Sequence, residues 1–277
     1  MTIDEIIDCA LEEDLGDGDH TSNSCLSSLA SGSACLVCKE AGVIAGIELA
    51  KKIFHRVDEN LNFKALVSDG NDIEVGQRLF EVDGKARSIL TAERTVLNFM
   101  QLMSGIATKT RFLTLLIGNH QAKLLDTRKT TPLLREIEKW AVRIGGGYNH
   151  RMGLYDMIMI KDNHADMTGG ITVAVKKVLQ YMKETGLDLK VEVEVRDLEQ
   201  LDEVLSINGV DRVMLDNFTP SLMTKAVGIV DGKIETEASG GITEETIADY
   251  AGTGVDYISV GALTNNIKSL DLSLKAN

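Results

Sequence analysis

The fold is decided by residues 190–217, KVEVEVRDLEQLDEVLSINGVDRVMLDN, in which two short apolar runs flank a segment with helical spacing. The runs KVEVEV (190–195) and RVMLDN (212–217) are predicted strands, and LEQLDEVLSI between them is a predicted helix that ends before Gly209. A strand, a helix and a second strand in this order predict two parallel strands joined by a right-handed crossover.

The same alternation extends over the second half of the chain. The predicted strands are 122–127, 156–161, 190–195, 212–217, 234–239 and 256–261. Such a repeat predicts an α/β fold in which a parallel sheet curves toward a barrel. Six strands are fewer than the eight of the standard barrel, so we expect a small, open β/α barrel of six to seven strands.

The first third of the chain has a different pattern. Its predicted elements are helices at 2–13 and 47–57 and strands at 34–37, 63–67 and 78–82. Short strands mixed with amphipathic helices predict an N-terminal α+β sandwich domain. A long helix at 91–116, which we expect to break near Ser104-Gly105, would then link the two domains.

The expected domain ranges follow from these patterns. We assign 1–107 to the sandwich domain and 108–265 to the barrel, and we expect the tail 266–277 to pack on the sandwich domain.

Composition narrows the class of protein. The 277 residues are 44% hydrophobic and 26% charged, which is close to the average for globular proteins and excludes a disordered chain. No segment approaches the roughly 18 apolar residues of a membrane helix. The acidic N-terminal segment lacks the pattern of a secretory signal, so we expect a cytoplasmic protein. The net charge of −13 argues against a general nucleic-acid binder.

Cys35 and Cys38 form a C-x-x-C motif, which is found in redox and zinc sites. Here it lies in a predicted strand, where residues three apart point to opposite faces. No second C-x-x-C and no close pair of histidines completes a metal site, so we expect buried or surface thiols.

Chemically useful residues gather where the predicted strands end. They are Asp126, Arg128, Lys129, Lys161, Glu194, Asp216, Ser239 and Gly261. The carboxyl ends of parallel strands carry the active site in α/β folds, so we expect these residues to share one site.

A basic segment lies within this acidic chain, with eight Lys or Arg against four acids between Lys123 and Lys161. We interpret Arg135, Lys139 and Arg143 as a solvated helical face, because they repeat every four residues. Residues at strand ends and in the loop GGGYNHR (145–151) have no such explanation and predict an anion site. In that loop, His150 and Arg151 are candidate ligands, whereas His164 could brace the turn after Lys161.

Glu194 and Asp216 end neighbouring strands, and we expect their carboxylates to face one cavity. They could hold Mg²⁺, bind sugar hydroxyls or stabilise a developing cation. The alternative is a structural ion pair with Lys161. Two glycine loops, at Ser239–Gly241 and Val260–Ala262, predict backbone cradles for phosphate. Together these features predict a phosphorylated sugar and a second reactant that carries carboxylates.

Long, ordered motifs then identify a family. They are ERTVLNFMQLMSGIAT (93–108), the run from Asp126 to His164, VEVEV (191–195), VMLDN (213–217), EASGGIT (237–243) and GVDYISVGALT (254–264). The chain resembles quinolinate phosphoribosyltransferases over nearly its whole length. The resemblance implies transfer of phosphoribose from phosphoribosyl pyrophosphate (PRPP) to quinolinate, with decarboxylation to nicotinate mononucleotide and Mg²⁺ on the PRPP.

The resemblance also implies roles for individual residues. Arg128, His150 and Arg151 would hold the quinolinate carboxylates, joined by Arg94 from the other subunit of a homodimer; a hexamer is also compatible with the resemblance. Thr127, Lys129 and Lys161 would contact substrate, and Lys129 and Lys161 also the PRPP phosphates. Glu194 and Asp216 would bind ribose hydroxyls and metal, and the loops Ser239-Gly240-Gly241 and Val260-Gly261-Ala262 would cradle the 5′-phosphate. Asn265 stands where the family usually has a histidine, and Leu133 where a glycine is common.

Three other readings stay open. A Schiff-base aldolase would use Lys161 as nucleophile, which leaves Arg128 and Arg151 without a role. A non-catalytic or transport-linked paralogue would bind an anion without turnover. A sister enzyme acting on nicotinate would need fewer cationic contacts.

Overall fold

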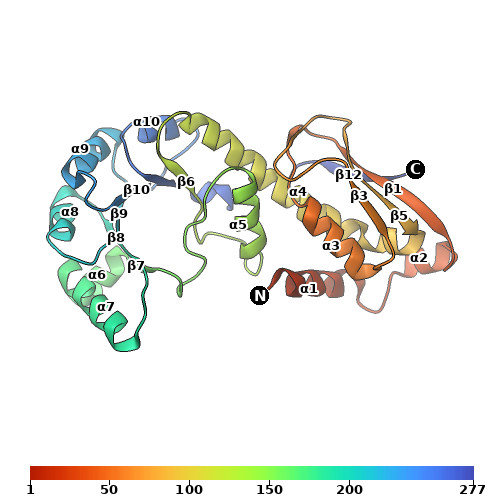
Figure 1. The fold of residues 1–277 in the computed structure, drawn as a ribbon, viewed down its shortest axis with the longest axis horizontal. Coiled ribbons are helices and arrows are strands. Elements are labelled where there is room, and N and C mark those ends of the chain that lie inside the picture. Colours follow the sequence, from red (N-terminus) through yellow and green to blue (C-terminus); the bar gives the residue numbers. More distant parts are fainter. The chain divides into compact units, whose positions relative to one another are not determined.

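The computed structural model describes residues 1–277, and the chain divides into two compact units (Figure 1). The first unit consists of Met1–Arg111, Thr130–Gly146 and Ala262–Asn277. The second consists of Phe112–Lys129 and Gly147–Gly261. The predicted tail segment therefore groups with the first unit, and so does the stretch from Thr130 to Gly146 within the predicted barrel range.

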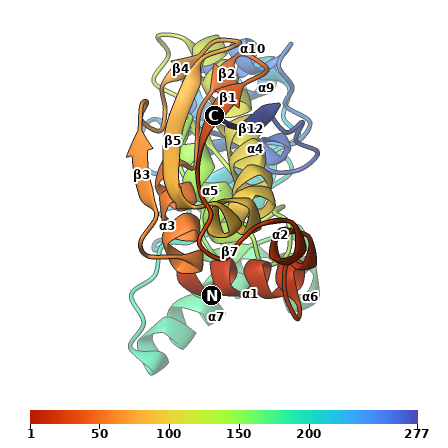
Figure 2. The same ribbon diagram turned by 90° about the vertical axis from the view of Figure 1, so that its right-hand side faces the viewer.

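The first unit contains a four-stranded antiparallel sheet, a separate antiparallel pair of short strands and several helices (Figure 2). Its elements are α1 (Ile3–Leu15), α2 (His20–Cys25), β1 (Ser31–Cys38), β2 (Gly42–Val43), α3 (Ile47–Val57), β3 (Asn62–Ala65), β4 (Asp72–Ile73), β5 (Arg78–Lys85), α4 (Ala86–Ile117, which continues into the second unit), α5 (Arg135–Ile144) and β12 (Leu272–Ala276). The sheet order is β12-β1-β5-β3, and β2 pairs with β4. The C-terminal strand β12 thus pairs with β1, through contacts such as Leu36 with Leu274.

The second unit is a six-stranded parallel sheet with order β6-β11-β10-β9-β8-β7. Its elements are β6 (Lys123–Leu125), β7 (Ile158–Ile160), α6 (Asp162–Thr168), α7 (Ile171–Thr185), β8 (Val191–Val195), α8 (Leu198–Leu205), β9 (Arg212–Asp216), α9 (Pro220–Val230), β10 (Glu235–Ser239), α10 (Ile247–Ala251) and β11 (Tyr257–Ser259). Every predicted strand is present. The first and last strands of this order do not pair with each other, so the sheet is open, as predicted.

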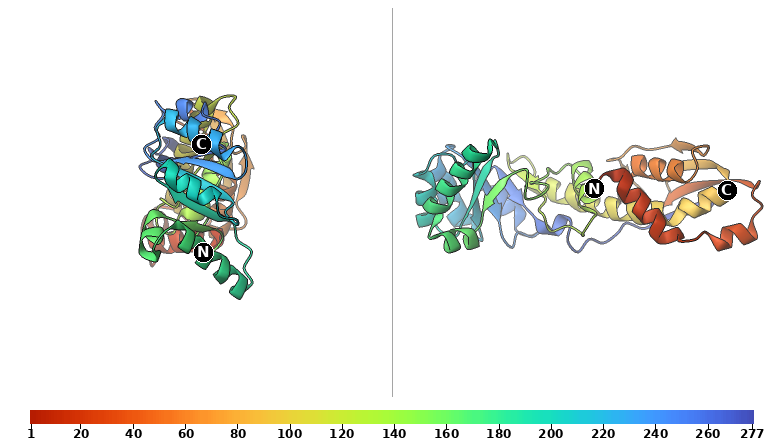
Figure 3. Two further views of the ribbon diagram at one scale, coloured as in Figure 1. Left: turned by 90° about the vertical axis from the view of Figure 1, so that its left-hand side faces the viewer. Right: turned by 90° about the horizontal axis from the view of Figure 1, so that it is seen from below.

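The helices of the second unit pack on one face of the sheet. Helices α7, α8, α9 and α10 each contact a strand of the sheet, and the left panel of Figure 3 shows them facing the viewer. Small and branched apolar side chains fill the space beneath them: Val193, Val213, Leu215 and Ala238 are fully buried. This packing leaves the carboxyl ends of the strands as one common edge.

The predicted break in the long helix is wrong, because α4 runs without interruption from Ala86 to Ile117. Ser104 and Gly105 serve packing instead. The Ser104 hydroxyl accepts a hydrogen bond from the amide of Ala45 at 3.0 Å. A Cβ at Gly105 would lie 2.3 Å from the carbonyl oxygen of Lys268, so glycine is needed there for close approach of the C-terminal segment.

The predicted solvated face of α5 is also wrong in part. Arg143 is exposed, but Lys139 is completely buried, as is its neighbour Glu138. The Glu138 carboxylate accepts a hydrogen bond from the amide of Thr131, and burial raises its pKa. The four-residue spacing identified the helix correctly but did not show which of its faces is covered.

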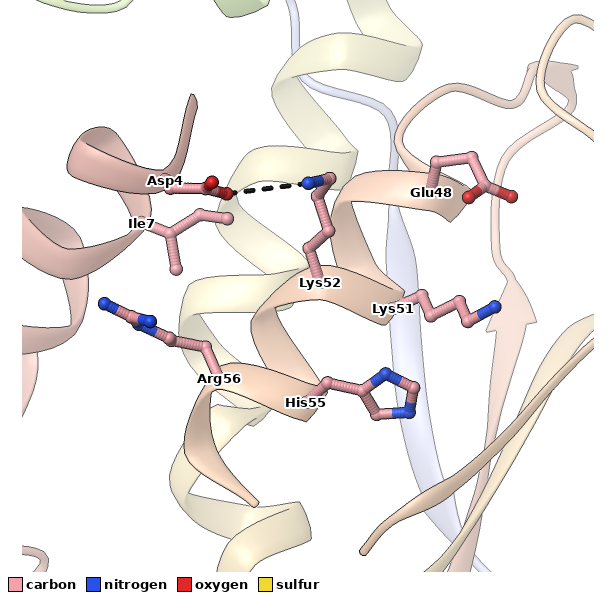
Figure 4. Close-up of a pocket in the computed structure, with 7 residues that line it drawn as sticks. All are labelled: Asp4, Ile7, Glu48, Lys51, Lys52, His55 and Arg56. Atoms are coloured by element: carbon pink, nitrogen blue, oxygen red, sulfur yellow. Dashed lines mark ion pairs between the residues drawn. The ribbon is translucent and has the colours of Figure 1, made fainter. Parts of the chain in front are cut away.

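A hollow of about 350 Å³ lies between α1 and α3 (Figure 4). Its lining residues are Asp4, Ile7, Glu48, Lys51, Lys52, His55 and Arg56. Lys52 lies 3.5 Å from Asp4, and Arg56 pairs with Asp8 at 2.6 Å, so acidic partners neutralise these cations. None of the predicted site residues lines this hollow.

Finally, no helix combines the length and apolar character required to cross a lipid bilayer.

We predict that Gly105→Ala lowers the free energy of unfolding by about 1–3 kcal/mol, because its methyl group would collide with a backbone carbonyl. Gly228→Ala in α9 is the matched control. Nothing lies within 4 Å of its Cβ position, so stability should be unchanged or higher by about 0.5–1 kcal/mol. Thermal and urea unfolding of the two variants measure the difference. Equal stability of the two would contradict the packing role of Gly105.

Candidate active site

Three charged side chains meet at the ends of β7, β8 and β9. The Lys161 ammonium lies 3.1 Å from Glu194 Oε2, and Asp216 follows on the next strand. Burial and the charge of Glu194 raise the pKa of Asp216, which shows that the two carboxylates repel each other. The alternative considered from the sequence, an ion pair between Lys161 and Glu194, is thus present, yet the Lys161 side chain remains 47% exposed and accessible to a ligand. This end of the sheet can receive a cation beside the two acids.

In the loop after β10, the backbone at Ser239 and Gly240 lies very close to Asn217. The amide of Asn217 donates to the carbonyl of Ser239 at 2.8 Å, and a Cβ at Gly240 would lie 2.2 Å from Asn217 Oδ1. Gly240 also has a φ of +94°, so only glycine fits. Beside it, nothing lies within 4 Å of a Cβ position at Gly241. The backbone here is open to a ligand, as a phosphate cradle requires.

The loop after β6 lies beside the end of β11. The Lys129 amide donates to Thr127 Oγ1 at 3.0 Å. A Cβ at Gly261 would lie 3.1 Å from Lys129 Cδ, so the lysine stem crosses over the glycine. β6 and β11 are paired neighbours, which brings these two predicted site loops together.

Two aspartates shape the loop from Gly147 to Met157. Asp126, which is fully buried, accepts hydrogen bonds from the side chain of Asn149 at 2.5 Å and the amide of His150 at 2.8 Å. Asp156 accepts from the amides of Met152 and Gly153. Acidic side chains at both ends therefore fix the backbone on either side of Arg151.

Arg128 and Arg151 form a cationic pair. Burial and the charge of Arg128 lower the pKa of Arg151, so the two guanidiniums are close enough to repel each other. The Arg151 Nη1 donates to the carbonyl of Met157 at 3.2 Å, which orients its side chain. Arg151, oriented in the glycine-flanked loop, and Arg128, in the loop after β6, offer two guanidiniums of the kind that can bind paired carboxylates.

His150 faces the interior of the sheet. Its Nε2 lies 3.0 Å from Glu192 and 3.3 Å from Glu237, and all three side chains are buried. Burial alone would lower the pKa of His150, but the adjacent carboxylates of Glu192 and Glu237 outweigh it and raise the pKa. The amide of Arg151 donates to Nδ1 at 2.7 Å and opposes a second proton on that nitrogen. The ring thus presents its Nε2 proton to the carboxylates.

Sequence reasoning missed most of this buried cluster. It did not assign a role to Glu192, Glu237 or Arg212. The signal was present, because a charged residue inside an otherwise apolar strand is rare unless it is paired. Only strand register reveals the partners: Glu192 lies opposite Arg212 on the neighbouring strand.

Comparison with known proteins decides the family. The model of the C-terminal domain of quinolinate phosphoribosyl transferase matches residues 106–275, and the N-terminal domain model matches residues 19–104. The chain belongs to this family. The resemblance inferred from the sequence motifs is thereby confirmed.

Relatives support this membership over almost the whole chain. Quinolinate phosphoribosyltransferase [decarboxylating] 1 from Nicotiana glauca is 46% identical, over 98% of this chain and 81% of the relative. The probable nicotinate-nucleotide pyrophosphorylase [carboxylating] from Bacillus subtilis is 45% identical, over 95% of this chain and 89% of the relative.

Solved structures show the same fold. NadC from Streptococcus pyogenes is 39% identical, with a TM-score of 0.93 over 99% of this chain and 95% of that one. The nicotinate-nucleotide pyrophosphorylase from Francisella tularensis is 41% identical, with a TM-score of 0.92 over 99% and 96% of the two chains. The predicted combination of an N-terminal sheet domain with a parallel α/β domain is confirmed.

Three predicted residues of the family site belong to the first unit. Arg94 is exposed on α4, and Ala262 and Asn265 are exposed in the segment after β11. The other predicted residues, including Val260, belong to the second unit. His164 accepts a hydrogen bond from the amide of Lys161 at 3.0 Å, so it braces that turn.

We predict that Asp126→Asn destabilises the fold by about 1–3 kcal/mol. Both carboxylate oxygens of Asp126 accept hydrogen bonds, and in the amide an NH₂ group would replace one of these oxygens and face another N–H donor. The matched control is Asp231→Asn at the exposed end of α9, where φ is +47° and Asn is tolerated. Differential scanning calorimetry compares the two. A melting temperature for Asp126→Asn equal to that of the control would show that the buried carboxylate is dispensable.

Proposed function

We propose that this chain catalyses the reaction for which its relatives are named, the decarboxylating transfer of phosphoribose to quinolinate. The reactants are quinolinate and PRPP, and the products are nicotinate mononucleotide, CO₂ and pyrophosphate, a step in NAD biosynthesis. The observation that carries the proposal is the family match over nearly the whole chain, in which Lys161, Glu194 and Asp216 meet at the strand ends and Arg151 is held by the carbonyl of Met157.

Charge stabilisation accounts for the catalysis. The pyridine nitrogen attacks the anomeric carbon of PRPP as the bond to pyrophosphate breaks, so positive charge grows on the ribose. Glu194 and Asp216 supply carboxylates to face that charge, and Lys129 and Lys161 supply cations for the departing pyrophosphate. The open backbone at Ser239–Gly241, together with Val260–Ala262, holds the 5′-phosphate. Thr127 orients Lys129 through its hydroxyl.

The donor set at the end of β8 and β9 fits Mg²⁺. Glu194 and Asp216 offer carboxylate oxygens, which Mg²⁺ prefers, and their repulsion would be relieved by a cation. We propose that they hold Mg²⁺ together with PRPP, where the ion neutralises pyrophosphate charge. Lys161 would release Glu194 when substrate and metal enter.

We further propose a homodimer in which Arg94 of one subunit completes the site of the other. The loop that carries Arg151 supports this proposal, because its large side chains Tyr148, Leu154 and Tyr155 are 51–74% exposed. Neighbouring exposed apolar side chains of this size are typical of an interface. Asn265 can still donate a hydrogen bond to phosphate, but it lacks the charge of a protonated histidine.

The four cysteines are free thiols, which suits a reducing compartment, and we propose that this enzyme acts in the cytoplasm. Relatives from Nicotiana tabacum and Arabidopsis thaliana are named mitochondrial and chloroplastic.

The alternative of a Schiff-base aldolase is disfavoured by the surroundings of Lys161. Such a nucleophile needs an uncharged amine in an apolar pocket, whereas Lys161 is 47% exposed and paired with Glu194.

We predict that the protein forms nicotinate mononucleotide from quinolinate and PRPP only with Mg²⁺, and that nicotinate is not a substrate. Arg128→Ala and Arg151→Ala should each raise the KM for quinolinate by about 30-fold or more, because each removes a charge-assisted contact. Lys177→Ala, exposed on α7, is the control and should leave KM unchanged. Binding of PRPP or quinolinate without product would instead support a non-catalytic paralogue.

A shared site also predicts complementation between inactive variants. At quinolinate concentrations far below the raised KM, Arg94→Ala and Arg128→Ala should each show little activity. After subunit exchange their mixture should regain about a quarter of wild-type activity, since half the dimers then contain one intact site. Product formation before and after exchange measures this. No recovery, with exchange verified by mass spectrometry, would contradict the role of Arg94 across the interface.

A further inference from the structure

A buried charged layer lies inside the sheet, one step below the strand ends that carry Glu194 and Asp216. It consists of Glu192 on β8, Arg212 on β9, Glu237 on β10 and the ring of His150. Glu192 lies opposite Arg212 in the strand register, two residues before Glu194. Glu192 and Glu237 are fully buried, and Arg212 is 8% exposed. Charged groups at this depth are stable only when each has a partner.

The partners are unevenly distributed. Arg212 bonds to Glu235 and Glu237, with its Nη1 3.1 Å from Glu237 Oε2. Neither oxygen of Glu192 makes a hydrogen bond, and its ion-pair contact is with His150 Nε2 at 3.0 Å. Turning the His150 ring away would leave a buried carboxylate without its nearest donor, which is costly in a protein interior. The two glutamates therefore hold the ring in one orientation.

The opposite side of the His150 ring contacts the backbone of the loop from Gly147 to Met157, which carries Arg151. His150 Nδ1 accepts the amide hydrogen of Arg151 at 2.7 Å. The amide of His150 itself is held by Asp126 at 2.8 Å. The ring thus links the charged layer to the peptide unit from which the Arg151 guanidinium projects.

We propose that Glu192 and Glu237 are positioning residues for the dicarboxylate substrate, which act through the His150 ring to fix the backbone of Arg151 and never touch the substrate. This inference rests on the proposed role of Arg128 and Arg151 in binding quinolinate. A small displacement of the Arg151 guanidinium weakens a bidentate contact strongly. Loss of either glutamate should therefore weaken the binding of quinolinate and leave the binding of PRPP unchanged.

The same donor atoms of His150, Glu192 and Glu237 lie within 4.8 Å of one another, a spacing that could also suit a cation. Arg212 already places a positive charge on Glu237, and a divalent ion would have to enter beside it. The geometry thus favours an ion-pair network as the role of this layer.

Glu237→Gln and Glu192→Gln test the proposal, because each keeps the side-chain shape and removes the charge. Glu235→Gln is the matched control: it lies on the same strand and also pairs with Arg212, but it does not contact His150. Either test variant should raise the KM for quinolinate at least 10-fold and change the KM for PRPP less than 2-fold. The control should change both constants less than 2-fold.

A double-mutant cycle then separates positioning from general stability. In a His150→Gln background, adding Glu237→Gln should change the KM for quinolinate less than 2-fold, since the link is already broken. Full additivity, equal effects on both substrates, or failure of both glutamine variants to fold would overturn the proposal. Arg151→Ala, measured in the same series, tests the substrate site separately: if it alone leaves the KM for quinolinate unchanged, the proposed site is wrong.

Discussion

The parallel pairing of six strands is the constraint on which the rest of the second unit depends. Because all six run in the same direction, their carboxyl ends form one edge, and residues far apart in the chain meet there. Lys161, Glu194 and Asp216 each end a strand and so become neighbours. The glycine loops after β10 and β11 lie along the same edge, and Gly241 adds open backbone to these charges.

The two acids and the two arginines of the site occupy different parts of this edge. Acids stand at the ends of β8 and β9, whereas the arginines belong to the loops after β6 and before β7. This separation suits a reaction in which positive charge grows on a sugar while negative charge leaves as pyrophosphate. Below the edge, the charged layer of Glu192, Arg212 and Glu237 replaces the apolar contacts that usually fill a barrel of this kind. Buried ion pairs usually add little to the free energy of folding. The main effect of this layer is therefore the orientation that it imposes on the His150 ring.

The sequence predicted elements better than it predicted partners. The helix at 47–57 and all six barrel strands follow from local periodicity, which depends on nearby residues alone. The prediction of a helix break at Ser104-Gly105 was wrong because the reason for the glycine lies far away in the sequence. Gly105 leaves room for the backbone carbonyl of Lys268, more than 160 positions later in the chain. The prediction that Lys139 is solvated was wrong for a related reason. Spacing by four residues shows that side chains share one face of a helix, but not whether another part of the chain covers that face. The roles of Glu237 and Arg212 required strand register, which no single segment encodes.

The pairing of β12 with β1 has a consequence for how the chain is made. The second unit has all its strands once Ser259 has been synthesised, whereas the sheet of the first unit lacks its outer strand until Ala276 follows. During translation, the N-terminal part of the chain emerges first, but its sheet is the last to obtain all of its strands. Until then, the edge of β1 carries unpaired backbone groups, which makes the nascent sandwich domain the part of this protein most exposed to mispairing before release from the ribosome.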